Sequence, residues 1–243
     1  MSGLFSMDAW STVWNHKESF LLGLGNTLQT AVCALALAFA IGALLGLMAT
    51  SGNQILKFVA RVYVEFIQNT PLLLQLCFLY YALAFAGLSL GVIRTGIIAL
   101  GVYTGAYMGE VVRAAIESVP KGQFEAGYAQ GFNTAEVLLY IVLPQAYRNI
   151  VPTLLSQVIT TIKDSSYLAN VATIELMARI RQLLSAAGTY NGLGTVNVSD
   201  VMVLFGAACV IYFIINFTLS CIVRSMQNKR KKALVFAPAK NAA

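Results

Sequence analysis

The sequence is poor in charged residues. Asp, Glu, Lys and Arg make up 11% of its 243 residues, whereas apolar residues make up 58%, and the mean hydropathy is +0.72. Soluble domains contain about 25% charged residues, so we expect lipid to be the main solvent of this chain. The net charge of +6 does not indicate nucleic-acid binding, because the basic residues form no stripe with interleaved aromatic residues.

Histidine and the common site motifs are also scarce. The only histidine, His16, lies outside every long apolar run, which leaves no base beside a Ser or Cys nucleophile. The four cysteines, at positions 33, 77, 209 and 221, show no CxxC spacing, and no HExxH or GxxxxGKS/T motif occurs. We therefore expect no catalytic residue, no metal site and no directly bound nucleotide or other cofactor.

The first 18 residues lack the features of a secretory signal, so we expect a short retained N-terminal segment.

Long apolar runs predict an all-α integral membrane protein with about five transmembrane helices. A bilayer core about 30 Å thick requires roughly 20 apolar residues per helix. The candidate spans cover residues 20–48, 55–88, 93–116, 137–162 and 201–223. In the second span, we expect Thr70 to precede a helix that starts at Pro71, because proline suits the first helical position. The basic tail from Arg224 places the C-terminus inside and, with five spans, the N-terminus outside.

Two features inside the spans have alternative interpretations. Gly101, Gly105 and Gly109 expose a flat backbone stripe that either lines a subunit contact or a pore, or serves tight packing between helices. The apolar run from 150 to 162 is too short to cross a bilayer. Either the polar residues 163 and 164 lie at membrane depth, or the chain dips in and returns through 168–177. In the first span, polar residues within 26–29 predict a face that meets protein.

We expect one transmembrane domain over residues 1–243, with a helical core at about 20–225, a cytoplasmic loop at about 120–144 and a basic cytoplasmic tail at 224–243. The cytoplasmic loop carries the most specific pattern. Its members are Glu125-Ala126-Gly127, Gly131, Ile141 and Leu143-Pro144. Gly131 can take the left-handed conformation that ends a helix, and Asn133 with Glu136 forms a capping-box pattern. These residues predict two short helices joined as a rigid elbow, which either couples to a soluble partner or is merely structural.

This spacing resembles the EAA loop of ATP-binding cassette importer permeases. The departure is Gly127, where the family usually has Ala, and we expect it to loosen the first helix. The segment 67–75, IQNTPLLLQ, resembles the Arg-Gly-Thr-Pro-Leu segment of the polar amino-acid permeases for histidine, glutamine and arginine, although Gln68-Asn69 replaces Arg-Gly. The segment 163–166, Lys-Asp-Ser-Ser, is similar to another element of that family.

The resemblance implies a type I importer transmembrane fold in a bacterial cytoplasmic membrane. It also implies three kinds of partner: a second permease subunit, identical or related; a cytoplasmic ATPase dimer that holds ATP and Mg²⁺; and an external or periplasmic amino-acid-binding protein. The residues implied in ATPase coupling are Gly122, Gln123, Glu125, Ala126, Gly127, Gly131, Leu143 and Pro144. Which amino acid is carried, and whether this subunit itself binds it, stays open.

Ionisable and polar groups at membrane depth usually face a cavity or a partner. Such groups include Glu65 before the proline and the pair Glu110 and Arg113 in the third span. The residues that we assign to a substrate pathway are Gln68, Gln75, Gln157, Lys163, Asp164 and Ser165. Asp164 and Gln157 would contact the charged ends of the amino acid, or else serve only contacts between helices. Glu110 and Arg113 lie three residues apart on one helix, which favours a structural ion pair over a ligand site.

A self-contained ion-coupled transporter is the alternative function. That class commonly has more spans and internal repeats, whereas five helices without a visible repeat are too few to build an alternating-access path alone. The sequence therefore favours a permease that works with partner subunits.

Overall fold

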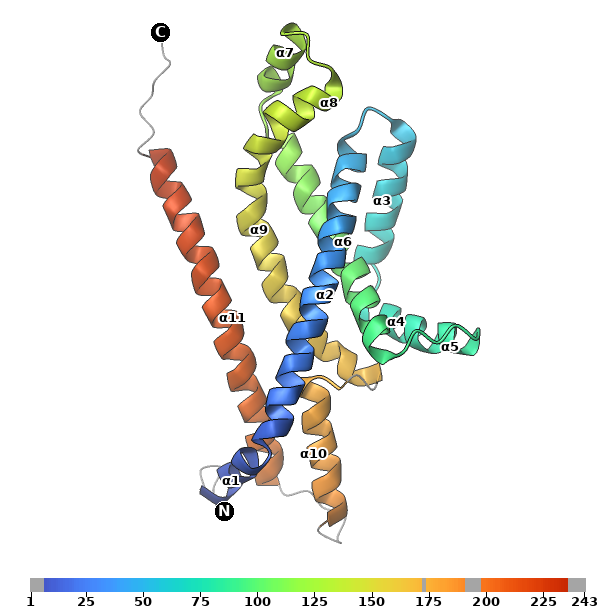
Figure 1. Cartoon of the computed structure of the whole chain (residues 1–243), viewed down its shortest axis with the longest axis vertical. Helices are drawn as coiled ribbons and strands as arrows, with labels where there is room; N and C mark the ends of the chain where they lie inside the picture. The colour runs from blue at the N-terminus through green and yellow to red at the C-terminus, as the bar shows by residue number, and fades with distance from the viewer. Residues whose placement is uncertain (1–6, 172–173, 191–197, 236–243) are drawn as a thin grey trace.

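The computed structural model (Figure 1) describes residues 7–171, 174–190 and 198–235, and every regular element within them is helical. The α-helices are α1 (Met7–Asn15), α2 (Lys17–Thr50), α3 (Gln54–Gln68), α4 (Leu72–Cys77), α5 (Leu83–Phe85), α6 (Val92–Glu117), α7 (Lys121–Ala129), α8 (Thr134–Glu136), α9 (Leu143–Asp164), α10 (Leu176–Tyr190) and α11 (Val198–Val235). Phe78–Ala82 and Val137–Val142 are π-helical, and Ser165–Val171 is a 3₁₀ helix.

The long helices α2, α3, α6, α9 and α11 run along the long axis of the molecule (Figure 1). The helices α7 and α8, the turn between α2 and α3, and the C-terminal part of α11 lie toward one end, and α1 and α10 lie at the other. The first end carries Lys57, Lys121 and Arg224. Because basic residues mark the cytoplasmic side, we name it the inner end and the opposite one the outer end.

Fewer helices qualify as spans by composition than the sequence predicted. Three helical stretches of the described chain are long and apolar enough, Lys17–Thr50, Val92–Glu117 and Val201–Asn228, and the bent pair of α3 with α4–α5 makes a fourth. The fifth predicted span corresponds to α9, whose 22 residues reach roughly 33 Å. α9 lies beside α6 and α11 (Figure 1), but it is too polar to count by composition.

Glycines bring α2 and α6 into close contact. A Cβ atom added to Gly42 of α2 would lie 2.5 Å from Met108 Cβ of α6. In the other direction, a Cβ added to Gly105 of α6 would lie 2.8 Å from Ile41 Cγ2 of α2. The same stripes also contain Gly46 on α2 and Gly101 and Gly109 on α6. The glycine stripe noted in the sequence therefore packs against another helix of the same chain, where small residues let backbones approach.

The second predicted span is broken, since α3 and α4–α5 meet at 98°. Pro71 is the residue before α4, so the predicted helix start at Pro71 is wrong by one residue. Thr70 does not cap α4, because its hydroxyl donates back to Phe66 O at 2.9 Å. The Gln75 Nε2 atom instead crosses the break and donates to Ile67 O at 2.9 Å and to Thr70 Oγ1 at 2.6 Å. This side chain holds the bend by satisfying polar groups that the break frees.

The fourth predicted span corresponds to the π-helical segment Val137–Val142 followed by α9. α9 continues to Asp164, and the 3₁₀ helix that follows leads to α10, which points toward the outer end (Figure 1). A buried hydroxyl pair, Thr104 of α6 and Thr161 of α9, joins the two helices at 3.1 Å between Oγ1 atoms. Lys163 and Asp164 therefore lie between the two ends of the molecule, and their position at membrane depth stays a prediction.

The close contact between α2 and α6 is named the α2–α6 seam. Replacing one of its glycines by a larger residue should destabilise the fold. We expect Gly42→Leu to lower the apparent melting temperature of the detergent-solubilised protein by about 2–12 °C, because overpacking costs about 1–3 kcal/mol and each kcal/mol shifts Tm by about 2–4 °C. Gly206→Leu is the matched control, since an added Cβ at Gly206 of α11 meets no heavy atom within 4 Å. Equal melting temperatures for the two variants would contradict the α2–α6 seam.

Candidate functional site at the inner end

The predicted cytoplasmic loop forms a compact elbow at the inner end (Figure 1). We name residues 121–142 the inner elbow; they comprise α7, the turn at Gly131, α8 and the π-helical segment Val137–Val142. α6 enters the inner elbow and α9 leaves it. The elbow thus connects two of the long helices at the same end of the molecule.

Gly131 ends α7 as the sequence predicted. Its φ of +87° is left-handed, and its N–H donates to Tyr128 O at 3.0 Å. The next residue, Phe132, donates its N–H to Gly127 O at 3.2 Å. These two bonds form a Schellman motif, which satisfies the last carbonyl groups of the helix. An L-residue with a Cβ strains this turn, although nothing lies within 4 Å of where the Cβ would stand.

The predicted capping box at the start of α8 is confirmed. Glu136 N donates to Asn133 Oδ1 at 3.0 Å, and Asn133 N donates to Glu136 Oε2 at 2.8 Å. The reciprocal pair satisfies two backbone donors that a helix start otherwise leaves free. Together with the Gly131 turn, it fixes the angle between α7 and the chain that follows.

Gly127 is a point of close contact between α7 and the π-helical segment, and the expected loosening of α7 itself stays a prediction. Gly127 is buried, and a Cβ added there would lie 2.7 Å from Ile141 Cδ1 and 2.8 Å from Val137 Cγ2. The missing side chain lets α7 pack directly on the π-helical segment. Gly127 therefore tightens the inner elbow.

A buried apolar cluster anchors the inner elbow to α6 and α9. Its members are Val112, Ala115, Ile116, Val119, Val137, Val142, Ala146 and Ile150, with Phe124 and Leu143 packed against them. The residues come from the end of α6, from the elbow and from the start of α9. The cluster therefore packs the elbow against both helices.

Pro144 explains the π-helical segment that precedes α9. Proline has no N–H, and in a regular helix its ring clashes with the carbonyl four residues earlier, here that of Tyr140. The wider π turns at Val137–Val142 accommodate such a residue without breaking the helix. The Leu143-Pro144 pair thus continues the elbow into α9.

The exposed surface of the inner elbow carries small residues and aromatic side chains. Glu125 and Ala126 are exposed on α7, and so is Gly122, where an added Cβ would meet nothing within 4 Å. Exposed aromatic side chains stand nearby: Tyr128, Phe132 and Tyr140, the last two with ring centroids 6.5 Å apart. Gln145 Nε2 of α9 braces α7 by donating to Gln123 Oε1 at 3.1 Å. This arrangement offers a rigid, partly apolar knob without a reactive side chain.

The predicted pathway residues do not gather in one place. Gln75 holds the α3–α4 bend, and the Ser165 hydroxyl is buried and donates to Ile162 O at 2.7 Å. Lys163 is exposed and lines a pocket of about 610 Å³ between α9 and α11. Gln157 and Asp164 lie seven residues apart, hence two turns apart on one face of α9, and both are half-buried. Gln68 is half-buried at the end of α3.

Glu110 and Arg113 are in contact, with Arg113 Nε donating to Glu110 Oε2 at 2.9 Å. Arg113 also forms an ion pair with Glu117, one turn further along α6, which the sequence reasoning did not anticipate. The three side chains form a small charged cluster near the inner end.

The sequence reasoning missed a buried carboxylate at the outer end. Glu175, which has no exposed surface, precedes α10, and its Oε1 accepts a hydrogen bond from Ala178 N at 2.7 Å. Its Oε2 accepts from Tyr212 of α11 at 3.2 Å and from Thr27 of α2 at 3.5 Å. Glu175 thereby joins three helices. In the sequence, only the polar residues at the start of α2 indicated such a contact, because Thr27 and Glu175 lie 148 residues apart along the chain.

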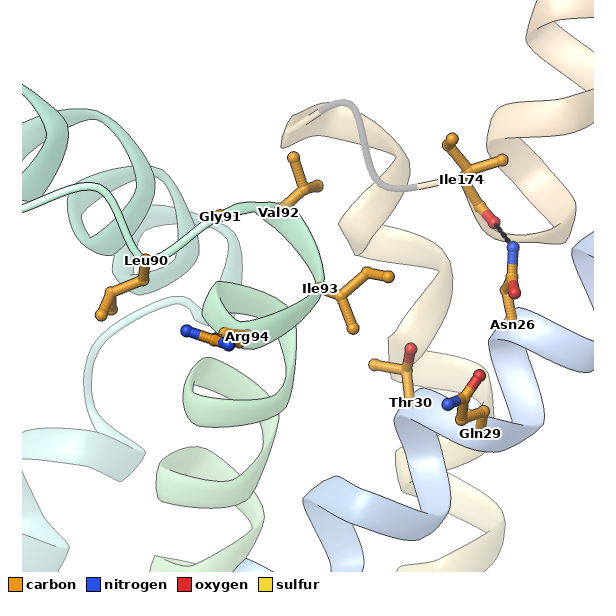
Figure 2. A pocket seen from close by; sticks show the side chains of 9 residues that line it. All are labelled: Asn26, Gln29, Thr30, Leu90, Gly91, Val92, Ile93, Arg94 and Ile174. Atoms are coloured by element: carbon orange, nitrogen blue, oxygen red, sulfur yellow. Dashed lines mark hydrogen bonds between the residues drawn. The ribbon is translucent and has the colours of Figure 1, made fainter.

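A shallow pocket of about 520 Å³ opens beside this network, between α2 and the start of α6 (Figure 2). Asn26 Nδ2 donates to Ile174 O at 2.6 Å at its edge. Ile93 points toward Thr30 of α2, whereas Arg94 projects from the other side of the same turn (Figure 2). The polar face predicted within 26–29 therefore meets protein at Asn26 and Thr27.

Comparison with protein families identifies most of the chain. Residues 38–232 match the family described as "Binding-protein-dependent transport system inner membrane component". The chain is 34% identical over 223 residues to the "Probable glutamine ABC transporter permease protein GlnM" of Bacillus subtilis, covering 92% of this chain and 98% of that relative. It is 33% identical over 224 residues to the "Glutamine transport system permease protein GlnP" of Escherichia coli K12, covering 91% and 97%. The "L-cystine transport system permease protein TcyB" of Bacillus subtilis is 32% identical over 217 residues, 88% of each chain.

Solved structures agree with these relatives. The "Crystal structure of an amino acid ABC transporter with histidines" matches with a TM-score of 0.79 and 28% identity, covering 93% of this chain and all of that one. The inward-facing MetNI methionine ABC transporter matches with a TM-score of 0.65 and 21% identity, over 87% and 98%, which supports the fold alone. The predicted type I importer transmembrane fold is thus confirmed.

The Gly131 turn should be sensitive to a side chain. We expect Gly131→Ala to destabilise the turn by about 1–2 kcal/mol, since a left-handed L-residue costs about that much, and to speed amide hydrogen exchange within 121–136. Gly122→Ala is the control, because it adds a methyl group to an open position inside α7 and should stabilise the helix by roughly 1 kcal/mol. Unchanged exchange in Gly131→Ala would mean that this turn does not hold the elbow.

Proposed function

The chain belongs to the family of binding-protein-dependent transport system inner membrane components, and we propose that it forms, with a second permease subunit, the path of an ABC importer for a polar amino acid. The named relatives transport glutamine and cystine, and this supports an amino-acid substrate. None of them is named as an ion-coupled transporter, so the alternative function gains no support from them.

The observation that carries the proposal is the rigid inner elbow. Its exposed surface suits docking into a cleft of a soluble ATPase, because small residues permit close approach and aromatic side chains supply apolar contact. Its buried cluster joins the elbow to α6 and α9. Closure of two ATPase subunits would move these helices as one body and reorient the paired permeases.

ATP and Mg²⁺ bind the partner ATPase in this proposal. The chain itself carries no GxxxxGKS/T sequence for a nucleotide phosphate, and its role is to convert motion of the ATPase into a change of access. The protein works in a bacterial cytoplasmic membrane, with the inner elbow in the cytoplasm. An external binding protein delivers the amino acid to the outer end, where the pocket beside Ile93 and Arg94 is open to such a partner.

The pathway assignment rests on α9. Gln157 and Asp164 share one face of this helix and lie between the two ends of the molecule, at the depth where charged groups are costly unless they face water or a ligand. We assign them contacts with the charged ends of the amino acid. Gln68, Lys163 and the hydroxyl groups near them remain further candidates for the same path, whereas Gln75 is already engaged at the bend.

Cross-linking tests the docking of the inner elbow. We expect Ala126→Cys, in a cysteine-free background, to cross-link to the copurifying ATPase subunit, because Ala126 is exposed on the elbow. Asn15→Cys, exposed at the outer end, is the control and should give no such product. Cross-linking at Asn15 instead, or no ATPase in the purified complex, would overturn the assignment.

Substitution of Asp164 tests the pathway. Asp164→Ala should lower ATP-driven amino-acid uptake by about tenfold or more, the loss expected from one hydrogen bond to a charged group, while assembly with the ATPase stays intact. Asp164→Asn should retain part of the uptake, since the amide still accepts hydrogen bonds. Uptake kinetics equal to those of the unsubstituted complex would remove Asp164 from the pathway.

A further inference from the structure

A pocket of about 480 Å³ lies between α2, α3 and α6 near the inner end. None of the predicted pathway residues lines it. The charged residues on its walls are Lys57, Arg61 and Glu65 of α3 and Glu110, Arg113 and Glu117 of α6. Small-molecule sites have volumes of about 300–1,000 Å³, so the pocket is large enough for a metabolite.

The α3 residues extend this charge from the inner end toward the middle of the molecule. Lys57, Arg61 and Glu65 recur every four residues and therefore share one face of α3. At 1.5 Å per residue, Arg61 and Glu65 lie roughly 10 and 16 Å along the helix from its start. α3 runs alongside α2 (Figure 1), which is long and apolar enough to cross a membrane. Charges at such depth usually face a water-filled cavity or a ligand.

The α6 acids are neutralised, but the α3 cations are not. Arg113 pairs with both Glu110 and Glu117. Among the described residues, neither Lys57 nor Arg61 has a carboxylate oxygen within 4.0 Å. These cations therefore face the pocket without an acidic partner in the part of the chain that the structure describes.

The third α3 charge is negative and stands one turn beyond Arg61. Glu65 Oε2 accepts a hydrogen bond from Asn69 Nδ2 at 3.2 Å, and no ion pair joins Glu65 to Arg61. The pocket thus presents two unpaired cations and, further along the same helix face, one carboxylate. A ligand with an acid group at one end and an ammonium group nearby matches this order of charges.

We propose that this pocket binds a free amino acid, as a zwitterion, from the cytoplasmic side. The carboxylate of the ligand lies between Lys57 and Arg61, and its ammonium group pairs with Glu65. The walls carry three cations and three carboxylates, so a zwitterion leaves the pocket neutral, whereas a simple anion does not. The inference rests on the proposed function, since it places the imported product on the permease at the side where it accumulates.

Site-specific labelling tests this proposal in the whole complex. Ala49 of α2 lines the pocket and is half-buried. Ala49→Cys is introduced after the four native cysteines are replaced by Ala, and its modification by a charged thiol reagent is timed in inside-out vesicles. Millimolar L-glutamine should slow the modification, whereas glutaramate, which lacks the ammonium group, should not.

Substitutions identify the groups that hold the ligand. Lys57→Gln with Arg61→Gln should raise the L-glutamine concentration that gives half protection by about tenfold or more, the effect of losing hydrogen bonds to charged groups. Glu65→Gln should do the same, and its amide can still accept from Asn69, which protects the local fold. Arg94→Gln, which removes one positive charge at the outer end, is the control and should leave the protection unchanged.

Each outcome has a defined meaning. Equal protection by glutaramate and L-glutamine, or protection that survives both α3 substitutions, overturns the proposal. Slow labelling that depends on phosphatidylethanolamine and not on added L-glutamine assigns the pocket to a lipid headgroup and also overturns it. ATP-driven uptake by the same complex is measured in parallel. Uptake without protection refutes only the pocket, whereas absence of both uptake and a bound ATPase refutes the proposed function.

Discussion

The close contact between α2 and α6 is the constraint on which the rest of the structure depends. Glycines on each helix accept side chains of the other, so the two backbones approach closely. In lipid, such packing contributes more than apolar burial, because hydrocarbon tails solvate leucine as well as protein does. The seam gives α3 and α9 a fixed pair of helices against which to lie.

The inner elbow connects α6, one member of that pair, to α9. Three local devices set its shape: the Schellman turn at Gly131, the capping box of Asn133 with Glu136, and the close contact at Gly127. One buried cluster then joins it to α6 and α9. None of these devices involves chemistry on a substrate. They suit a segment that transmits motion from the proposed soluble ATPase to the membrane helices.

Polar groups inside the molecule have different roles at the outer end, in the middle and at the inner end. At the outer end, Glu175 is fully buried and joins three helices through hydrogen bonds. In the middle, Thr104 and Thr161 bond to each other across α6 and α9. At the inner end, the charges of α3 and α6 line an open pocket instead. Polar side chains that are hydrogen-bonded within the chain hold helices together. Charged side chains without such a partner mark places where a ligand can supply the missing charge.

The sequence by itself determined the features that depend on neighbours along the chain: the long apolar helices, the capping box, the left-handed Gly131 and the family pattern that includes Leu143-Pro144. One of its errors was local, the helix start at Pro71, whereas the 98° bend of the second span was not foreseen. Only the tertiary structure decided what lies across from a residue. The glycine stripe of α6 packs against α2, and Gly127 packs against the π-helical segment. Glu175 accepts a hydrogen bond from a residue 148 positions away along the chain. Periodicity and capping are short-range, whereas packing and burial depend on segments that the chain brings together only when it folds.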